Sequence, residues 1–482
     1  MVFPDKKTIF AKKNYCLLMK PLVYIVMAIM LTNMSCVTKK DHTDHSDTLC
    51  EVRLITLNPG HFHAALVQKI SYPSVCKDVY VYAPEGDDLQ AHLQRIEGYN
   101  TRPETPTEWN EIVYTGADYL EKMLRDKPGN VMITAGNNGK RVEYLKAALL
   151  AGINVLADKP MAINVEGFKA LQECFEIARR EGVLLYDMMT ERFEITTILQ
   201  KEFSLIPGVY GEQQAGTPDD PGIVKESVHH FLKTVSGNPL IRPAWFFDVQ
   251  QQGAGVVDVT THLVDLVQWE CFPGQIVDYT KEVELADANS WDTPLSLAEF
   301  QKVTGLETYP DFLQKDVRDN VLHVYSNGDI TYKIKNIYAK VSVSWNYTFP
   351  EGGGDTHFSI MKGSKSHLII EQGREQGYKP LLTIKAVKGN DLATFENELA
   401  EALKTITAKY PGVTLTKKES DAWTVEVPER YHNDHEAHFG QVTENFLKYL
   451  SEGALPDWEA PNMITKYYIT THALEMATNK QR

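Results

Sequence analysis

The chain has 482 residues, of which 43% are hydrophobic and 23% are charged, and this is enough for two domains with cores of their own. The formal net charge of -15 argues against nucleic acid as a partner, because a phosphate-binding surface needs a basic patch and the sequence concentrates none. No internal repeat or low-complexity tract is present.

The first fifty residues have the pattern of a targeting segment. Met19-Lys20 precede PLVYIVMAIMLTNMSC, whose apolar run is too short to span a bilayer and ends near Ser35-Cys36. This pattern is similar to a bacterial lipoprotein signal, in which the cysteine is lipidated and becomes the mature N-terminus. The alternative is an ordinary secretory signal, because Asn33 stands where lipoprotein signals usually carry an aliphatic residue. We expect residues 1–50 to be a signal and tether, with lipidation at Cys36, export to the periplasm and attachment to a membrane through the lipid.

Cysteine spacing carries no structural signature in the rest of the chain. Of six cysteines, Cys16 and Cys36 belong to the targeting segment. The other four stand at positions 50, 76, 174 and 271, without C-x-x-C spacing. This distribution indicates neither a zinc site nor a disulfide framework.

Residues 51–194 alternate short apolar runs with amphipathic stretches, which is typical of a parallel sheet with crossover helices. Helices are predicted at GKRVEYLKAALLAG and at NVEGFKALQECFEIARREG, the second with an Asn cap and with Gly182 at its end. The fold class is therefore α/β, with a doubly wound sheet whose ligands bind beyond the carboxyl ends of the strands. The predicted strands are Val52 to Leu57, Val79 to Ala83, Val131 to Ala135, Val155 to Ala157 and Val183 to Met188.

Two motifs occur in an order and at a separation that are specific. The first runs from TAGN, residues 134–137, through ALLAG to Asp158-Lys159-Pro160, and the second is GAGVVDVTTHLVD, residues 253–265. They resemble the T-P-N, A-L-x-A-G and E-K-P elements and the G-G-G-x-x-x-D-x-x-x-H-x-x-D pattern of the glucose-fructose oxidoreductase and inositol dehydrogenase (Gfo/Idh/MocA) family. The match covers roughly Val52 to Trp269. It implies an NAD(P)-dependent oxidoreductase with a Rossmann domain at residues 51–194.

The resemblance implies a phosphate loop at NPGHFHA, residues 58–64, in which one family glycine remains. Gly60 matches the last glycine, while Ile55 and Leu57 replace the other two. Helix N-terminal amides can still receive phosphate, so we expect tightly bound NAD, with Glu85 on the adenosine ribose favouring NAD over NADP. The alternative is a degenerate loop without a cofactor. The predicted cofactor-binding residues are Asn58, Gly60, His61, Phe62, Glu85, Asn137, Asp158, Lys159 and Pro160.

A dehydrogenase of secondary alcohols needs a base for the hydroxyl proton and a cationic donor beside it. His262 suits the first role and Lys159 the second, and in the resembled family the matching residues lie around the substrate and the nicotinamide. Asp258 stands four residues before His262, so on a helix its carboxylate would lie beside the imidazole and fix its tautomer. The alternative is a solvated strand-end lysine, a helix cap and a satisfied, partly buried histidine.

Residues 195–482 are predicted to form the substrate-binding domain, an α+β domain with a largely antiparallel sheet. HVYSNGDITYKIKNIYAKVSVSWNYTF and THFSIMKGSKSHLIIEQG have the pattern of strands joined by Asn-Gly and Gly-Ser turns. In the resembled family such a sheet packs near the nicotinamide or against a second subunit, which implies a homo-oligomer. Solvent-facing strand and loop positions are the alternative for several substrate candidates. These candidates are His229, His230, Lys233, Trp245, Asp265 and His435.

The segment ERYHNDHEAHFGQV is not part of the family pattern. It sets His432, His435 and His438 three residues apart. A metal site is conceivable, since imidazole is a common metal ligand, but this spacing is a looser match than H-E-x-x-H and we predict no metal. The alternatives are a contribution of His435 to the substrate pocket and a capped helix start with exposed histidines.

These features predict an exported oxidoreductase acting on a secondary hydroxyl of a sugar, glycoside or polyol. Two alternatives stay open. Some members of the resembled family are glycosidases that oxidise a sugar transiently, eliminate the aglycone and reduce the sugar again on bound NAD, which suits a compartment where free NAD is scarce. From a different class, the chain would be a non-catalytic carbohydrate-binding lipoprotein on a degenerate dehydrogenase fold.

Overall fold

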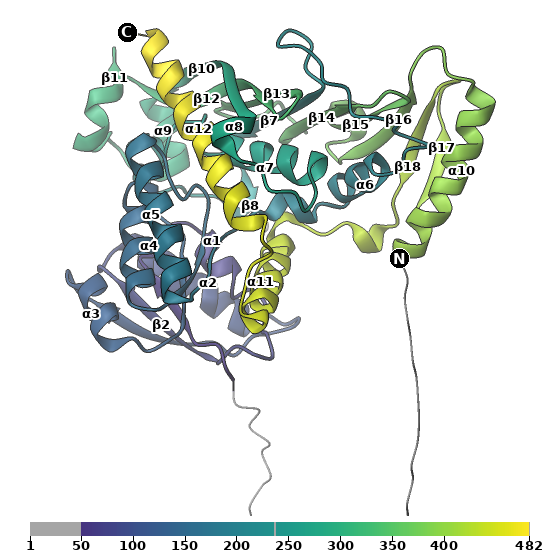
Figure 1. Cartoon of the computed structure of the whole chain (residues 1–482). Helices are drawn as coiled ribbons and strands as arrows, with labels where there is room; N and C mark the ends of the chain where they lie inside the picture. The colour runs from purple at the N-terminus through teal and green to yellow at the C-terminus, as the bar shows by residue number, and fades with distance from the viewer. Residues whose placement is uncertain (1–49, 236–237, 482) are drawn as a thin grey trace, which may run out of the picture. The chain divides into compact units, whose positions relative to one another are not determined.

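Two sheets organise the chain in a computed structural model that describes residues 50–235 and 238–481 (Figure 1). One sheet has six strands and the other has ten, and a short two-stranded sheet, β8 (Thr234–Val235) with β9 (Asn238–Pro239), lies apart from both. The predicted lipidation site, Cys36, lies outside the described residues. Within the described ranges, no helix is both long enough and apolar enough to cross a membrane.

The N-terminal sheet is parallel, with strand order β3-β2-β1-β4-β5-β6, and it confirms the predicted doubly wound arrangement. Its central strands are buried on both faces, as crossover helices require. The sequence pattern does not predict β3, because this edge strand exposes Ile112 and Val113 and has no continuous apolar run. The strands are β1 (Leu54–Leu57), β2 (Asp78–Ala83), β3 (Asn110–Thr115), β4 (Val131–Thr134), β5 (Asn154–Ala157) and β6 (Leu185–Asp187).

Helices cover both faces of this sheet. The longest begins and ends as predicted, because the side chain of Asn164 accepts a hydrogen bond from the amide of Gly167 and Gly182 adopts a left-handed φ of 68°. The helices are α1 (His63–Leu66), α2 (Asp87–Thr101), α3 (Tyr119–Asp126), α4 (Arg141–Leu150) and α5 (Val165–Glu181), with 3-10 turns η1 (Asn138–Lys140) and η2 (Thr190–Phe193).

The C-terminal sheet has strand order β10-β12-β13-β7-β14-β15-β16-β18-β17, with β11 paired to β12. Every neighbouring pair is antiparallel except β13 with β7, which confirms the predicted largely antiparallel sheet. The strands are β7 (Ile223–His230), β10 (Val283–Ser296), β11 (Val317–Arg318), β12 (Val321–Ile334), β13 (Ile337–Asn346), β14 (Thr356–Lys362), β15 (Ser366–Gln372), β16 (Leu381–Ala386), β17 (Thr414–Lys417) and β18 (Ala422–Glu426).

Of the two predicted hairpin turns, one is confirmed and one is wrong. Gly363 and Ser364 join β14 to β15, whereas Asn327-Gly328 lies inside β12. A Cβ at position 328 would collide with the side chain of Val256, so this glycine lets the segment before α7 (Thr260–Cys271) approach the sheet closely. The β12–β13 turn lies instead at Lys335, with φ 53°.

The last two long helices join the second half of the chain to the first. α11 (His435–Glu452) and α12 (Glu459–Gln481) contribute Phe439, Phe446 and Tyr467 to the same apolar core as β1, β4 and β5. Figure 1 shows α12 running alongside α7, which it contacts, as it also contacts α5 and β10. The remaining helices are α6 (Ile195–Ser204), α8 (Tyr279–Glu282), α9 (Leu297–Thr304) and α10 (Leu392–Lys409), with 3-10 turns η3 (Ala244–Phe247), η4 (Asp311–Asp316), η5 (Arg374–Gln376) and η6 (Glu429–Tyr431).

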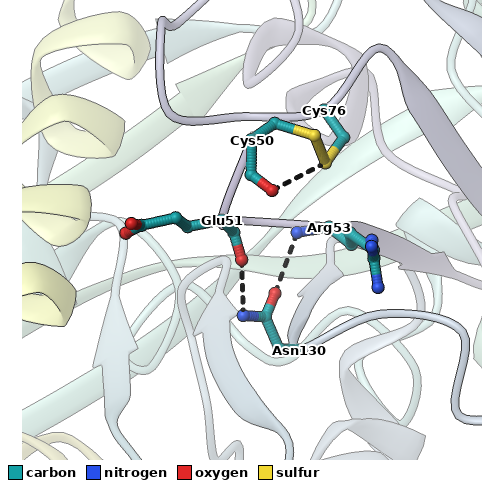
Figure 2. Close-up of a disulfide and its surroundings, with 5 residues drawn as sticks. All are labelled: Cys50, Glu51, Arg53, Cys76 and Asn130. Carbon is teal, nitrogen blue, oxygen red and sulfur yellow. Dashed lines mark hydrogen bonds between the residues drawn. A yellow bond between two sulfur atoms is a disulfide. The ribbon is translucent and has the colours of Figure 1, made fainter. Parts of the chain in front are cut away.

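A disulfide joins Cys50 to Cys76, although the spacing of the cysteines indicates no disulfide framework (Figure 2). The two segments are already paired by their backbones, because the amide of Cys76 donates to the carbonyl of Val52 at 2.8 Å and the amide of Val52 donates to the carbonyl of Ser74 at 2.9 Å. The side chain of Asn130 also binds the chain on both sides of Val52 (Figure 2). Chain pairing of this kind leaves no signature in cysteine spacing.

Candidate functional site

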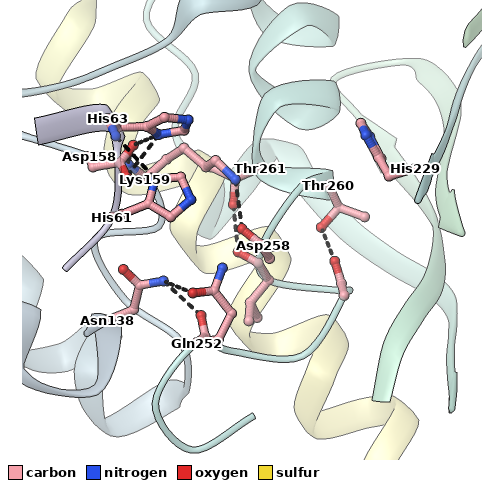
Figure 3. Close-up of polar contacts among 12 residues, drawn as sticks. His61, His63, Asn138, Asp158, Lys159, His229, Gln252, Asp258, Thr260 and Thr261 are labelled. Carbon is pink, nitrogen blue, oxygen red and sulfur yellow. Dashed lines mark hydrogen bonds and ion pairs between the residues drawn. The ribbon is translucent and has the colours of Figure 1, made fainter. Parts of the chain in front are cut away.

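The predicted catalytic lysine and aspartate meet at the carboxyl edge of the parallel sheet (Figure 3). Lys159 follows β5, and its Nζ donates a hydrogen bond to a carboxylate oxygen of Asp258 at 2.6 Å. The two side chains are 10% and 7% exposed, so water screens this ion pair little. The ion pair therefore holds the Lys159 ammonium, a cationic hydrogen-bond donor, just beyond the carboxyl end of β5.

His262 lies in the first turn of α7 beside this pair and is buried. Burial, and then the charge of Lys159, lower its pKa well below the usual value, so the imidazole is neutral at neutral pH. Its Nδ1 atom has no hydrogen-bond partner in the described part of the chain. A neutral imidazole with an unpartnered nitrogen is able to accept a proton.

Asp258 does not orient His262 as the sequence predicts. α7 begins at Thr260, so Asp258 lies before the helix and the four-residue spacing does not bring the two side chains onto one face. Among the described residues, the carboxylate of Asp258 accepts a hydrogen bond from Lys159. Asp258 is thus a partner of the lysine rather than of the histidine.

Asp265, a predicted substrate residue, has a different environment. Its two carboxylate oxygens accept hydrogen bonds from Arg192 at 2.6 and 2.7 Å, and Lys466 on α12 donates to one of them at 2.9 Å. Burial opposes ionisation, but these two cations outweigh it and hold the pKa of Asp265 well below its usual range. The carboxylate joins α7 to α12 and η2 and is already bound by these two cations, and substrate binding by Asp265 stays a prediction.

Three other predicted substrate residues gather around a carboxylate that sequence analysis missed. His230 Nδ1 lies 2.9 Å from Asp355, His229 Nδ1 lies 3.3 Å from it, and Lys233 Nζ lies 3.1 Å from it. Burial opposes ionisation of Asp355, yet the hydrogen bond with His229 and the charge of Lys233 hold its pKa well below the usual range. Asp355 stands in the loop before β14, where no sequence motif marks it.

Trp245, another predicted substrate residue, covers the predicted phosphate loop at Gly60. Its Nε1 donates to Asp88 on α2 at 2.9 Å. A Cβ at Gly60 would lie 3.0 Å from the carboxylate of Asp88 and 3.2 Å from the indole of Trp245. The amides of Gly60 and His61 both donate to the carbonyl of Ala135, at 3.0 and 3.1 Å. The indole predicted for a sugar face thus packs on the loop instead.

The loop histidines converge on the first residue of the D-K-P motif (Figure 3). His63 Nδ1 lies 3.1 Å from both carboxylate oxygens of Asp158, and His61 Nδ1 lies 3.8 Å from Oδ2. The amide of Lys159 donates to Oδ1 of Asp158 at 2.9 Å. Burial, before any charge effect, lowers the pKa of both imidazoles well below the usual value.

The remaining predicted cofactor residues border this edge of the sheet. Glu85 is exposed after β2, and the side chain of Asn137 accepts from the amide of Gly139 and donates to Gln251 at 2.7 Å. Asn58 has a left-handed φ of 46°, and its side-chain Nδ2 donates to the hydroxyl of Tyr144 at 3.0 Å. Phe62 is partly buried against the ring of His61, and Pro160 is buried.

Only one member of the histidine segment on α11 reaches this site closely. The ring centroid of His435 lies 5.9 Å from that of His63, and its Nε2 lies 3.9 Å from the carboxylate of Glu191. The side chain of His435 is 47% exposed. His432 is exposed, and in the described ranges His432, His435 and His438 do not bring their nitrogens together as metal ligands. Sequence analysis also missed Glu191, whose pKa burial and then Glu194 raise to about 7.

A nicotinamide dinucleotide fits this edge at its two ends. The unpartnered nitrogen of His262 and the Lys159 ammonium suit the reacting end, and the exposed Glu85 suits a ribose diol. Between these two ends, the place for the phosphates at Gly60 is narrower, because the side chains of Trp245 and Asp88 cover this glycine. Both contacts are made by the ends of side chains, so a phosphate can approach the loop once those side chains turn away.

Two family descriptions match the chain. The one described as "Putative oxidoreductase C terminal domain" matches residues 199–478, and the one described as the oxidoreductase family with an NAD-binding Rossmann fold matches residues 89–186. None of the curated proteins compared with the chain matches it.

Three solved structures of oxidoreductases are also similar to this chain. An oxidoreductase structure from Parabacteroides merdae ATCC 43184 is 65% identical, with a TM-score of 0.88, and the match covers 89% of this chain and 98% of that one. A levoglucosan dehydrogenase bound to NADH and L-sorbose is 12% identical, with a TM-score of 0.57 over 89% of this chain and 97% of that one. GenD2 from gentamicin A biosynthesis, in complex with NAD, is 12% identical, with a TM-score of 0.53 over 92% and 98%. The last two likenesses show the fold alone.

Proposed function

Because the chain belongs to the Gfo/Idh/MocA family of NAD-binding oxidoreductases, we propose that it oxidises a secondary hydroxyl of a carbohydrate with a retained nicotinamide dinucleotide. The observation that carries the proposal is the Lys159–Asp258 ion pair beside a buried, neutral His262 with an unpartnered nitrogen. A cationic donor and a neutral base side by side are what alcohol oxidation needs.

Each of the three residues has a role in this proposal. His262 accepts the substrate hydroxyl proton on its free nitrogen, since its lowered pKa keeps that nitrogen unprotonated. Lys159 donates a hydrogen bond to the same oxygen as negative charge develops there. Asp258 holds the ammonium in place at 2.6 Å. The bound dinucleotide supplies the hydride acceptor.

A carbohydrate is the substrate class that the lining supports best. Asp355, His229, His230 and Lys233 offer several donors and an anionic acceptor within one cluster, which suits a ring with adjacent hydroxyls. The levoglucosan dehydrogenase among the similar structures acts on such a molecule, and it shares the fold with this chain. His435 stands next to the cluster and completes the proposed pocket.

The cofactor proposed here is NAD, held next to a carboxylate that opposes its phosphates. Glu85 favours an unphosphorylated ribose, because an acidic side chain repels the 2′-phosphate of NADP. Asp88 lies 3.0 Å from the position of a Cβ on Gly60, so its negative charge weakens phosphate binding. Asp88→Asn should therefore tighten NAD binding by about tenfold, as measured by calorimetry, with Asp87→Asn as the matched control. Unchanged or weaker binding would contradict this placement of the phosphates.

Export and lipid attachment are proposed together with the enzymatic function. The Cys50–Cys76 disulfide supports export, because structural disulfides persist in oxidising compartments. Mass spectrometry of the full chain made in a bacterium should find lipid on Cys36, and Cys36→Ala should move the protein from the membrane to the soluble periplasmic fraction. A wild-type protein that is already soluble and unlipidated would refute the anchor.

A second candidate function is glycoside cleavage through transient oxidation. Glu191 favours it, because a carboxyl whose pKa is raised to about 7 is suited to the extra proton transfer that elimination of an aglycone requires. The two functions differ in products. Release of an aglycone from a nitrophenyl glycoside without net accumulation of NADH supports cleavage, and stoichiometric NADH supports simple oxidation.

The decisive experiment has two readouts on the purified full chain. Mass spectrometry of the denatured protein should find released NAD, and absorbance should report cofactor reduction by a panel of sugars and glycosides. His262→Ala and Lys159→Ala should each lower the rate by about a hundredfold with cofactor still bound, while the exposed His432→Ala should not. Absence of nucleotide in the protein together with no thermal shift on adding NAD or NADP would favour the non-catalytic binding protein instead.

A further inference from the structure

We propose that His61, His63 and Asp158 bind one divalent transition-metal ion at the carboxyl edge of the parallel sheet. Among the described residues, they are the group of histidine, cysteine and carboxylate side chains whose ligand atoms all lie within 4.8 Å of one another. Two imidazoles and one carboxylate are a ligand set that zinc and iron(II) sites use, with the remaining positions open to water or to another oxygen ligand. The proposal does not depend on the dinucleotide.

One of the two distances to Asp158 matches a metal site and the other exceeds it by about 0.3 Å, so His61 must move slightly when an ion binds. Metal bonds of about 2.1 Å place neighbouring ligand atoms roughly 3.0 to 3.5 Å apart at tetrahedral or octahedral angles. Oδ2 of Asp158 lies 3.1 Å from Nδ1 of His63 and 3.8 Å from Nδ1 of His61. The second distance exceeds that of a hydrogen bond, so Asp158 does not satisfy the ring of His61 directly. Within the described ranges, the ring of His61 accepts one hydrogen bond, from the amide of His63 at 3.4 Å.

The carboxylate is held so that one oxygen remains for the ion. The amide of Lys159 donates to Oδ1 at 2.9 Å, while Oδ2 is the oxygen nearest to the ring of His61. The side chain of Asp158 is 5% exposed, and those of His61 and His63 are 15% and 9% exposed. The three ligands thus come from the end of the β1–α1 loop, the first residue of α1 and the residue after β5.

Of two nearby cations, only one is neutralised among the described residues. Lys159 pairs with Asp258 at 2.6 Å. Arg141 directs its guanidinium to neutral oxygens of Thr134, Gly136 and Asn138 and keeps its charge. The ion would therefore meet one carboxylate charge and two imidazoles, with one positive charge nearby.

A metal site would also explain why the loop at residues 58–64 carries histidines. In this chain His61 occupies a loop position next to the one remaining glycine, and the amides of Gly60 and His61 bind the carbonyl of Ala135. Those two hydrogen bonds hold the backbone at His61, whose Nδ1 lies 3.8 Å from Oδ2 of Asp158. The altered loop thus presents ligands where the resembled family presents amides.

The test measures metal binding by the full chain with Co²⁺ alone, after removal of metal with a chelator. Elemental analysis and the visible d–d absorption of cobalt should report one ion per chain. His61→Ala should weaken binding by on the order of a hundredfold or more, and so should Asp158→Asn, with circular dichroism confirming that each variant is folded. His323→Ala, which removes another histidine paired with an aspartate, should bind as the wild type does.

Three outcomes would overturn the proposal. They are a folded wild-type chain that takes up no stoichiometric cobalt, unchanged affinity in His61→Ala, and loss of binding in His435→Ala but not in His61→Ala. Because the readouts are metal content and a metal spectrum, failure here leaves the dinucleotide proposal standing, and released NAD tests that proposal separately.

Discussion

Two clusters of buried ionisable side chains lie a short way apart along α7, and they differ in how their groups are paired. Around Asp265 the opposite charges are directly paired. Arg192 and Lys466 bind its carboxylate, and Lys466 also pairs with Asp187 at 2.8 Å. Around His262 the imidazole is neutral and one of its nitrogens has no partner among the described residues. The first cluster joins α7 to α12 and β6.

The contrast separates groups that stabilise the fold from groups that wait for a ligand. A buried charge is costly unless it is paired, so the Asp265 cluster is under structural constraint. An unpartnered buried nitrogen costs free energy as well, and a native protein keeps such a group where something else binds it. The sequence places Asp265 and His262 in one motif, but the structure assigns them to different clusters.

The largest expected effect comes from breaking the paired cluster. Arg192→Leu leaves the buried carboxylates of Asp265 and Glu459 without their guanidinium, so the free energy of unfolding should fall by about 3 to 5 kcal/mol in urea titrations. Lys404→Leu, which removes the exposed partner of Glu401, should change it by less than about 1 kcal/mol. Equal losses in the two variants would remove the distinction between the clusters.

Removal of the lysine's partner should affect rate rather than stability. Asp258→Asn keeps the shape of the side chain but loosens Lys159, so kcat should fall by about tenfold, less than in His262→Ala. The free energy of unfolding should fall less than in Arg192→Leu, because the amide oxygen of the new side chain can still accept a hydrogen bond from the Lys159 ammonium. A loss of stability as large as that in Arg192→Leu would place Asp258 in the structural cluster.

A smaller effect is expected at the substrate end. Asp355→Asn removes the charge that gathers His229, His230 and Lys233, and KM for the sugar should rise by about fivefold with kcat nearly unchanged. Asp355→Glu should recover part of the loss. A fall in kcat with constant KM would mean that this carboxylate acts on the reaction and not on binding.

The smallest effect is in pH dependence. A base must be unprotonated to accept a proton, and burial lowers the pKa of His262, so the acidic limb of kcat/KM should lie well below pH 6.5. At pH 6 a histidine of ordinary pKa would already have lost roughly three quarters of its basic form. The same lowered pKa contributes stability that is complete above pH 6.5 and is lost progressively as pH falls. A limb at pH 6.5 or above would show that His262 is not the base.

Local patterns in the sequence predict the parallel sheet, the cap and end of α5, and the segments that carry Lys159 and His262. Those features depend on residues close together in the chain. Partners from distant segments decide the rest, since Asp355 meets His229 across 126 positions and Trp245 meets Asp88 across 157. The sequence also misplaces Asp258, because a helix that begins at Thr260 instead of Asp258 changes which side chains share a face.

The place of α11 and α12 in the chain sets an order for folding during synthesis. Both helices follow the whole C-terminal sheet, yet Phe439, Phe446 and Tyr467 belong to the core of the N-terminal one. The first sheet emerges from the ribosome long before the side chains that complete it, and its apolar face stays uncovered until residues 435–481 have been made. A fragment ending at residue 194 should therefore aggregate rather than fold. We expect the nascent chain to stay bound to chaperones until α11 and α12 have been synthesised.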